Sequence, residues 1–198
     1  MHTEQTYAAV LTGAAFLLYE FKQVVQLKAQ GLSDREIREK VVSDNVFQYE
    51  KISSAKRAIT SLLRRVNALD DTLRRYALEG SHETVKGLNL YAIMKTDRLF
   101  REFMDEVIQE KWATDDYNLE KKELNTYFTT KAEQEEKVAA WSAQTVNKLK
   151  EVYLKILLET GILKDKASGE LNRLLLDADV KDHLRRIGDQ RYVQAMGE

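Results

Sequence analysis

The sequence contains no cysteine, no proline and only eight glycines among its 198 residues. Without cysteine the chain can form no disulfide, thiol nucleophile, iron–sulfur cluster or cysteine-ligated zinc site. An average proline usage of about 5% would give roughly ten prolines in a chain of this length. Because proline breaks helix interiors, its absence favours long helices. The glycines are too few and too scattered for a glycine-rich phosphate-binding loop.

An excess of charge of one sign is also lacking, since 31 Lys and Arg residues face 32 Asp and Glu residues, for a net charge of −1. The net charge therefore gives no indication of nucleic-acid binding, which would have to come from how the charges are arranged. Apolar residues make up 43% of the chain. That share is ordinary for a folded protein, and it suffices for one sizeable core or two modest ones.

The most hydrophobic run covers residues 7–19 and is followed by Glu20 and Lys22. It is too short for a membrane span, which takes about 20 apolar residues. The segment before it has no Lys or Arg and contains Glu4, unlike the basic start of a secretory signal. We therefore expect a buried core helix, or the lead-in to one, in a cytoplasmic protein with no membrane partner.

Apolar residues at helical spacing cover most of the chain and predict an all-α protein. Helix ends are indicated by residues that cap well, such as Ser followed by Glu three positions later, and by glycine. A helical segment should run from about residue 82 to 112, and the more polar stretch between 115 and 140 should form two short helices. The candidate caps and stops are Gly31, Ser33 with Glu36, Ser53 or Ser54, Asp70 or Asp71, Gly80 and Asp97.

The region after Ser142 has a different plan. A helix from about residue 143 to 159 should end at Gly161, which suits a left-handed cap. Two short apolar runs then flank a glycine-containing turn at 165–169, which is typical of a small β-hairpin. A helix followed by a hairpin is the order of a winged helix-turn-helix module.

The whole pattern predicts a compact multi-helix protein with helix-turn-helix elements and one short β-hairpin. We expect an N-terminal helical domain at residues 1–80, which contains a helix-turn-helix-like basic helix. We expect a C-terminal helical domain at residues 81–198, which contains a winged-helix-like module at about 130–176.

The basic helix is the third predicted helix, and its two sides differ strongly. Its apolar residues recur every three or four positions over 55–69, and no acidic residue occurs over 53–69. Cations on such a face suit phosphate oxygens, because they neutralise them and release counterions. The alternative is a solvated helix whose cations pair with acids on neighbouring helices. The predicted DNA-contacting residues are Lys56, Arg57, Thr60, Arg64 and Arg65.

The helix that follows Ser142 gives a second, weaker indication. Its first turns contain no acid and carry polar side chains of the kinds that read base edges. Glu151 counts against a close approach of DNA along the whole helix. Lysines on the predicted hairpin could reach the DNA backbone. The candidate DNA-contacting residues here are Ser142, Gln144, Asn147, Lys148, Lys164 and Lys166.

Catalytic and metal-binding patterns are missing, so the sequence predicts neither an enzyme nor a cofactor. The three histidines are far apart and lack partners at metal-ligand spacing. Glu79 and His82 have the spacing used in di-iron bundles, but those sites need two such pairs on helices. We expect Trp112 and Trp141 to be packing residues.

Short motifs that occur in a set order along nearly the whole chain carry a family resemblance. They are Leu11-Thr12-Gly13, residues 31–37, 54–57, 91–95 and 98–103, and Trp141-Ser142 leading to Gly161-Ile162-Leu163. In these motifs the chain resembles BrxA, the small component of BREX (bacteriophage exclusion) phage-defence systems. The resemblance implies an all-α, non-enzymatic DNA-binding protein with helix-turn-helix elements and no catalytic residues. It also implies an operon that encodes an ATPase, a DNA methyltransferase and a phosphatase-superfamily protein, which are candidate partners.

We therefore predict a protein that binds double-stranded DNA mainly through phosphate contacts from basic helices. One alternative is an assembly subunit that binds other defence proteins through exposed apolar residues such as Phe47 and Tyr49, with little DNA contact. Another alternative is RNA binding by the same basic helix, since an all-α bundle can present such a face to RNA.

Overall fold

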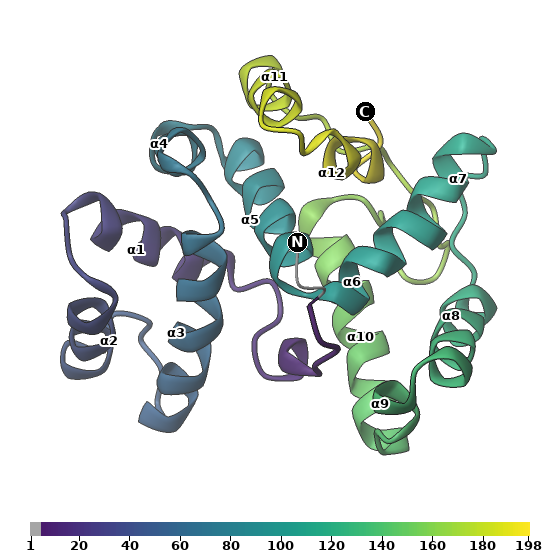
Figure 1. Cartoon of the computed structure of the whole chain (residues 1–198), viewed down its shortest axis with the longest axis horizontal. Helices are drawn as coiled ribbons and strands as arrows, with labels where there is room; N and C mark the ends of the chain where they lie inside the picture. Colours follow the sequence, from purple (N-terminus) through teal and green to yellow (C-terminus); the bar gives the residue numbers. More distant parts are fainter. Residues whose placement is uncertain (1–4) are drawn as a thin grey trace.

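A computed structural model describes residues 5–198, and the segment before Gln5, compared above with a secretory signal, lies outside the described residues. The described chain is mostly helical, as the periodicity predicts (Figure 1). The helices of the first part are α1 (Leu18–Ala29), α2 (Asp34–Ser43), α3 (Ile52–Asn67), α4 (Asp71–Glu79) and α5 (His82–Thr96). They are followed by α6 (Arg98–Phe103), the π-helical turn η2 (Met104–Ile108), α7 (Gln109–Ala113), α8 (Lys121–Gln134), α9 (Glu136–Ala139), α10 (Ala143–Thr160), α11 (Ala178–Arg186) and α12 (Gln190–Ala195).

Local capping chemistry sets several helix ends where the sequence predicts them. Ser33 and Glu36 form the expected capping box at the start of α2. The side chains of Asp70 and Asp97 accept backbone hydrogen bonds at the starts of α4 and α6. Gly161 ends α10 with a φ of 85°, in the left-handed region.

The apolar N-terminal run is a lead-in to a helix and not a helix along its length. It contains one short 3-10 turn, η1 (Val10–Thr12), before α1 begins. The side chains of Tyr7, Leu11 and Phe16 are buried. We call residues 5–17 the N-terminal strap, because this segment packs into the core and η1 is its one regular element. No helix among residues 5–198 is both long and apolar enough to cross a membrane.

Helix α5 lies in the interior and joins the two parts of the molecule (Figure 1). It packs on α1, α3 and α4 and also on α6 and α10. At Gly87 an added Cβ would lie 2.3 Å from Cδ2 of Leu176, so the glycine lets the segment after α10 approach α5 closely. Buried side chains from both parts form one contiguous core. The division into domains at residue 80 therefore stays a prediction.

The predicted β-hairpin is not confirmed. In this region the pairing is limited to isolated antiparallel bridges, between Leu163 and Leu171 and between Asn118 and Glu170. The turn itself is organised by Asp165, whose Oδ1 accepts hydrogen bonds from the backbone N–H groups of residues 167 and 168 at 2.9 and 2.8 Å. The second bridge brings the segment before α8 beside this turn, which the sequence pattern does not predict. The winged-helix-like module stays a prediction.

Candidate nucleic-acid interface

Helix α3 has the two-sided character that its sequence predicts. Ala58, Leu62 and Val66 are buried against the core, and the opposite side carries the cations. The helix begins earlier than predicted, at Ile52, and its N-cap is Lys51. Ser53 and Ser54, expected as caps, therefore lie in the first turn. No acidic residue lies in that turn, so nothing of opposite charge neutralises the helix start from within the helix.

Four exposed cations from α2 and α3 form what we call the basic ridge: Arg38, Lys56, Arg57 and Arg64. Among the described residues, no carboxylate oxygen lies within 4.0 Å of a side-chain nitrogen of these four. Other cations on α2 do pair with nearby acids, Arg35 with Glu39 in the helix and Lys40 with Asp44 at its C-cap. The ridge thus keeps positive charge that close ion pairs do not compensate.

Thr60 connects the two helices of the ridge. Its Oγ1 accepts a hydrogen bond from Nη1 of Arg38 at 3.0 Å and donates one to the carbonyl of Lys56 at 3.1 Å. Arg38 is not among the DNA-contacting residues predicted from the sequence. Its place beside α3 follows from the packing of α2, 22 positions earlier in the chain, and local periodicity carries no information on that packing.

Arg65 does not belong to this surface, and its predicted place on the polar face is wrong. The residue is only 2% exposed. Its guanidinium donates to the carbonyls of Phe16 at 3.0 Å and Ala15 at 2.7 Å, and also to that of Ala14. Burial lowers the pKa of Arg65 to about 10, although the charge of Asp97 opposes this, so the group stays protonated at neutral pH. Arg65 holds the N-terminal strap against α3 and is not available to a phosphate.

The start of α10 presents the polar side chains that the sequence predicts. Ser142 caps the helix by accepting from the N–H of Thr145 at 3.2 Å, and Gln144, Asn147 and Lys148 are exposed. The Nζ of Lys148 lies 3.1 Å from Oε2 of Glu151, with both side chains exposed. This face is therefore more nearly neutral than the basic ridge.

The two lysines of the predicted hairpin differ in their surroundings. The Nζ of Lys164 pairs with Glu170 at 2.7 Å across the turn. Lys166 is exposed, and no carboxylate of the described chain lies within 4.0 Å of it. Lys164 is thus partly neutralised, whereas Lys166 keeps its charge.

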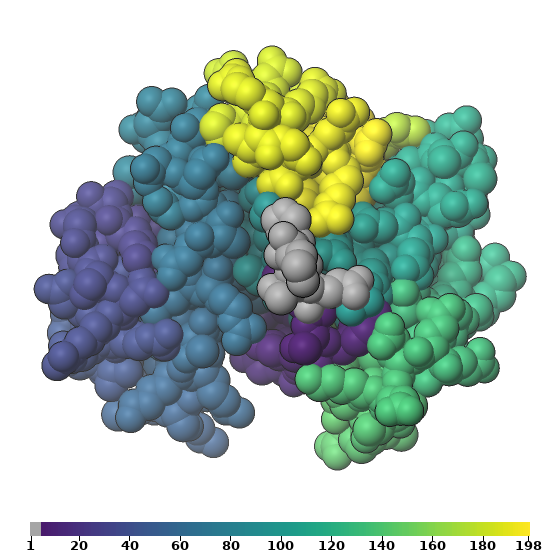
Figure 2. Space-filling model, in the orientation of Figure 1, coloured from purple at the N-terminus to yellow at the C-terminus, as the bar shows by residue number. Residues whose placement is uncertain are grey.

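The N-terminal strap lies between α3 and α10. Arg65 on α3 and Asn89 on α5 both donate to the carbonyl of Phe16, and η1 packs against α10. Figure 2 shows an indentation in the lower edge of this view, between α3 in blue and the start of α10 in green, with the purple N-terminal segment at its base. Thr12 from the strap and Gln144 from α10 line one groove at the start of α10.

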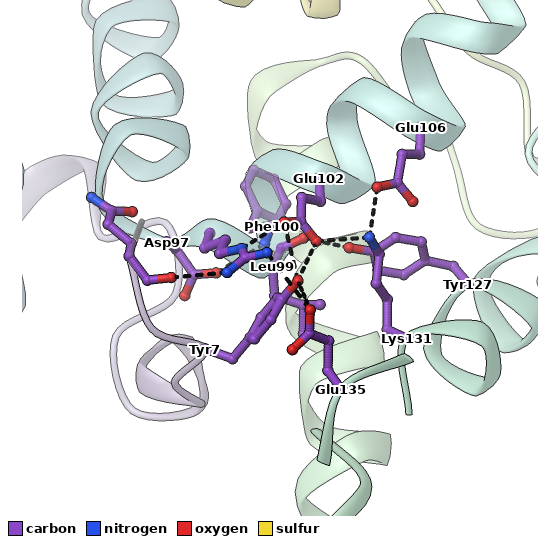
Figure 3. A network of polar contacts seen from close by, with 11 residues as sticks. Tyr7, Asp97, Leu99, Phe100, Glu102, Glu106, Tyr127, Lys131 and Glu135 are labelled. Carbon is purple, nitrogen blue, oxygen red and sulfur yellow. Dashed lines mark hydrogen bonds and ion pairs between the residues drawn. The ribbon is translucent and has the colours of Figure 1, made fainter. Parts of the chain in front are cut away.

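A network of polar contacts fastens the strap to the C-terminal part (Figure 3). The hydroxyl of Tyr7 donates to Oε2 of Glu102 at 2.9 Å and to Glu135 at 3.3 Å. The buried Nζ of Lys131 lies 2.7 Å from Glu102 and 2.6 Å from Glu106. These contacts join the strap to α6, η2, α8 and the start of α9.

The carboxylate at the centre of this network is held in its charged form. Burial alone would raise the pKa of Glu102, but hydrogen bonds from Lys131, Arg98 and Tyr7 outweigh it and hold that pKa below its usual range. Tyr7, Glu102 and Lys131 thus each have a partner in the network, which fastens the strap to the C-terminal part.

Two further expectations concern apolar and aromatic side chains. Phe47, expected as an exposed contact for partner proteins, is buried at 3% exposure, so that expectation is wrong. Tyr49 is half-buried and its hydroxyl donates to Glu20 at 2.7 Å. Trp112 is buried, as expected, and its Nε1 donates to the carbonyl of Ala195 at 3.2 Å.

Within residues 5–198 no three His, Cys, Asp or Glu side chains come together in a way that could hold a metal ion.

Comparison with known proteins decides the family. The family model described as BrxA matches residues 5–188. The chain belongs to the BrxA family. It is similar to a protein named BREX protein BrxA from Bacillus cereus (strain H3081.97), with 41% identity over 99% of this chain and 98% of that protein. A protein of the same name from Paramagnetospirillum magneticum (strain ATCC 700264 / AMB-1) is 22% identical over 98% of this chain and 97% of its own.

The BrxA fold described here also resembles a solved structure. A crystal structure of an uncharacterized protein from Magnetospirillum magneticum matches with a TM-score of 0.83 and 21% identity. The match covers 97% of this chain and 98% of the other. At that identity the likeness shows a shared fold.

Proposed function

We propose that this BrxA-family protein is a non-enzymatic component of a BREX phage-defence system that binds double-stranded DNA. The basic ridge on α2 and α3 would be the main contact with the phosphates. Other BREX proteins would be its partners, as the names of its relatives suggest.

The observation that carries the proposal is the unpaired charge of the basic ridge. Lys56 and Arg64 are eight residues apart on α3, so they lie about 12 Å from each other along the helix axis. Arg57 and Arg38 add charge beside them, and no described carboxylate lies within 4.0 Å of the four. Cations placed in this way gain from phosphate contact, because they exchange condensed counterions and water for the DNA backbone.

The start of α10 would make the second, weaker contact. Gln144 and Asn147 are exposed and can hydrogen-bond to base edges or phosphates. The pair between Lys148 and Glu151 reduces the electrostatic contribution of this helix. Helices α8, α9 and α10 are followed by a turn that bridges to residue 118. This order of elements fits a winged helix-turn-helix module.

The double charge reversal Arg57→Glu/Arg64→Glu tests the ridge. Binding of a fluorescently labelled random-sequence duplex of about 25 base pairs should weaken at least tenfold, because two favourable phosphate contacts become repulsive. Fluorescence anisotropy measures the change, and circular dichroism checks that the variant is folded. Competition with single-stranded DNA and with duplex RNA then tests the preference for double-stranded DNA.

A matched control changes the same number of charges elsewhere. Arg75 on α4 and Arg186 on α11 are exposed and outside the ridge. The variant Arg75→Glu/Arg186→Glu should bind within about twofold of the unmodified protein, apart from a general effect of net charge. Equal losses in both variants, or no loss in the ridge variant, would contradict the assignment to the ridge.

A further inference from the structure

A second feature, separate from the basic ridge, is a pocket of about 560 Å³ between the start of α8, the outer side of α10 and the turn after α10. Its volume falls within the range of about 300–1,000 Å³ that is typical of small-molecule sites. Bridging of residue 118 to residue 170 brings the lead-in to α8 against this turn. The pocket thus exists because three separate segments of the chain meet there.

The base of the pocket is apolar. Leu119, Leu124 and Leu163 are buried, and Leu154 on α10 is half-buried and also lines the pocket. Such a floor favours a flat or apolar part of a ligand, because burying that part removes apolar surface from water.

The mouth of the pocket is cationic. Lys121, Lys150 and Lys166 line it from α8, α10 and the turn. Among the described residues, no carboxylate oxygen lies within 4.0 Å of their Nζ atoms, although Nζ of Lys150 donates to Oδ1 of Asn125 at 2.9 Å. The acids at the rim are already paired, Glu120 with Lys122 at 2.9 Å and Glu151 with Lys148 at 3.1 Å.

We propose that this pocket binds a single nucleotide unit. The three lysines would hold its phosphate, and the leucine floor would pack against its base. The amides of Asn125 and Asn147, which also line the pocket, offer donors and acceptors to the base edge. The nucleotide can be a free mononucleotide or the phosphorylated end of a strand, since both present the same phosphate and base.

Isothermal titration calorimetry with AMP, GMP, CMP and UMP tests whether the pocket binds a free mononucleotide. At least one should bind with a Kd below about 1 mM, while adenosine and inorganic phosphate bind at least about tenfold more weakly, because each meets only half of the pocket. The double variant Lys150→Gln/Lys166→Gln should weaken nucleotide binding at least tenfold. Lys137 on α9 and Lys155 on α10 are exposed and do not line the pocket, so Lys137→Gln/Lys155→Gln is the matched control and should bind normally.

A short single strand with a 5′-phosphate tests whether the pocket binds the phosphorylated end of a strand. It is titrated into the Arg57→Glu/Arg64→Glu variant, with and without the pocket substitutions, so that the basic ridge does not contribute. Binding of the strand that depends on Lys150 and Lys166, without binding of mononucleotides, would assign the pocket to strand ends. The proposal is overturned if neither probe distinguishes the pocket variant from its control. That result would leave the proposed duplex binding by the ridge untouched.

Discussion

Arg64 and Arg65 are neighbours in the chain, yet their guanidinium groups have opposite surroundings. Arg64 is exposed on the basic ridge, whereas Arg65 is buried and donates to three carbonyls of the N-terminal strap. Spacing alone places Arg65 on the buried side, because it follows Leu62 by three positions and precedes Leu69 by four. The charge of an arginine would predict exposure, but at position 65 the helical spacing of apolar residues predicts the burial correctly.

Replacing each arginine by methionine should separate the two roles. Arg65→Met should lower the free energy of unfolding by about 3–5 kcal/mol, because it leaves buried carbonyls without donors. Arg64→Met should change that free energy by no more than about 0.5 kcal/mol and weaken DNA binding. Urea denaturation followed by circular dichroism measures both. Equal stability of the two variants would contradict the assignment of Arg65 to the core.

Asp97 gives a prediction of pH dependence. It is 8% exposed, and burial raises its pKa to about 6, even though the N–H of Phe100 and the charge of Arg65 oppose this. In the unfolded chain its pKa would lie near the usual 3.8. Between these values the folded state binds more protons, so Asp97 contributes stability below about pH 4 that is lost as the pH rises through 6.

The variant Asp97→Asn keeps an acceptor for the N–H of Phe100 but cannot titrate. Its free energy of unfolding, relative to that of the unmodified protein, should therefore increase from pH 4.5 to pH 7.5. Urea titrations of both proteins at about pH 4.5 and about pH 7.5 measure the difference in their free energies of unfolding. A difference that stays constant with pH would show that Asp97 does not titrate in this way.

At the scale of helices and turns, local chemistry is predictable from the sequence and pairing between distant segments is not. The capping box of Ser33, the cap at Asp97 and the stop at Gly161 depend on a few adjacent residues, and all three are found. The bridge between Asn118 and Glu170 joins segments that are 52 positions apart, and no local pattern specifies it. The placement of Arg38 beside α3 escapes prediction for the same reason.

Gly161, at the end of α10, provides a test of the left-handed cap, with Gly13 as the control. Gly161 has a φ of 85°, and an added Cβ would meet nothing within 4 Å, so Gly161→Ala tests backbone strain alone. We expect a loss of about 1 kcal/mol in the free energy of unfolding. Gly13 has equally open surroundings but a φ of −109°, so Gly13→Ala should cost less than about 0.5 kcal/mol. A smaller loss at Gly161 than at Gly13 in thermal or urea unfolding would contradict the left-handed cap.

At the scale of the whole molecule, the N-terminal strap links the two surfaces that we propose contact DNA. Arg65 and Asn89 hold its end at Phe16, and Tyr7 fastens its start to Glu102. The strap is thereby attached to α3, to α5 and to the C-terminal part, and η1 within it packs against α10. We therefore expect the placement of the basic ridge relative to the start of α10 to depend on these strap contacts.

The dependence of duplex affinity on salt tests the central claim most directly. If the four cations of the basic ridge contact phosphates, log affinity against log salt concentration should fall with a slope of about −3 to −4, at about −0.9 per contact. Fluorescence anisotropy titrations of the unmodified protein at several salt concentrations give this slope, and it should become shallower by about 2 in Arg57→Glu/Arg64→Glu. Absence of binding at low salt, or an affinity that does not change with salt, would contradict DNA binding by the ridge.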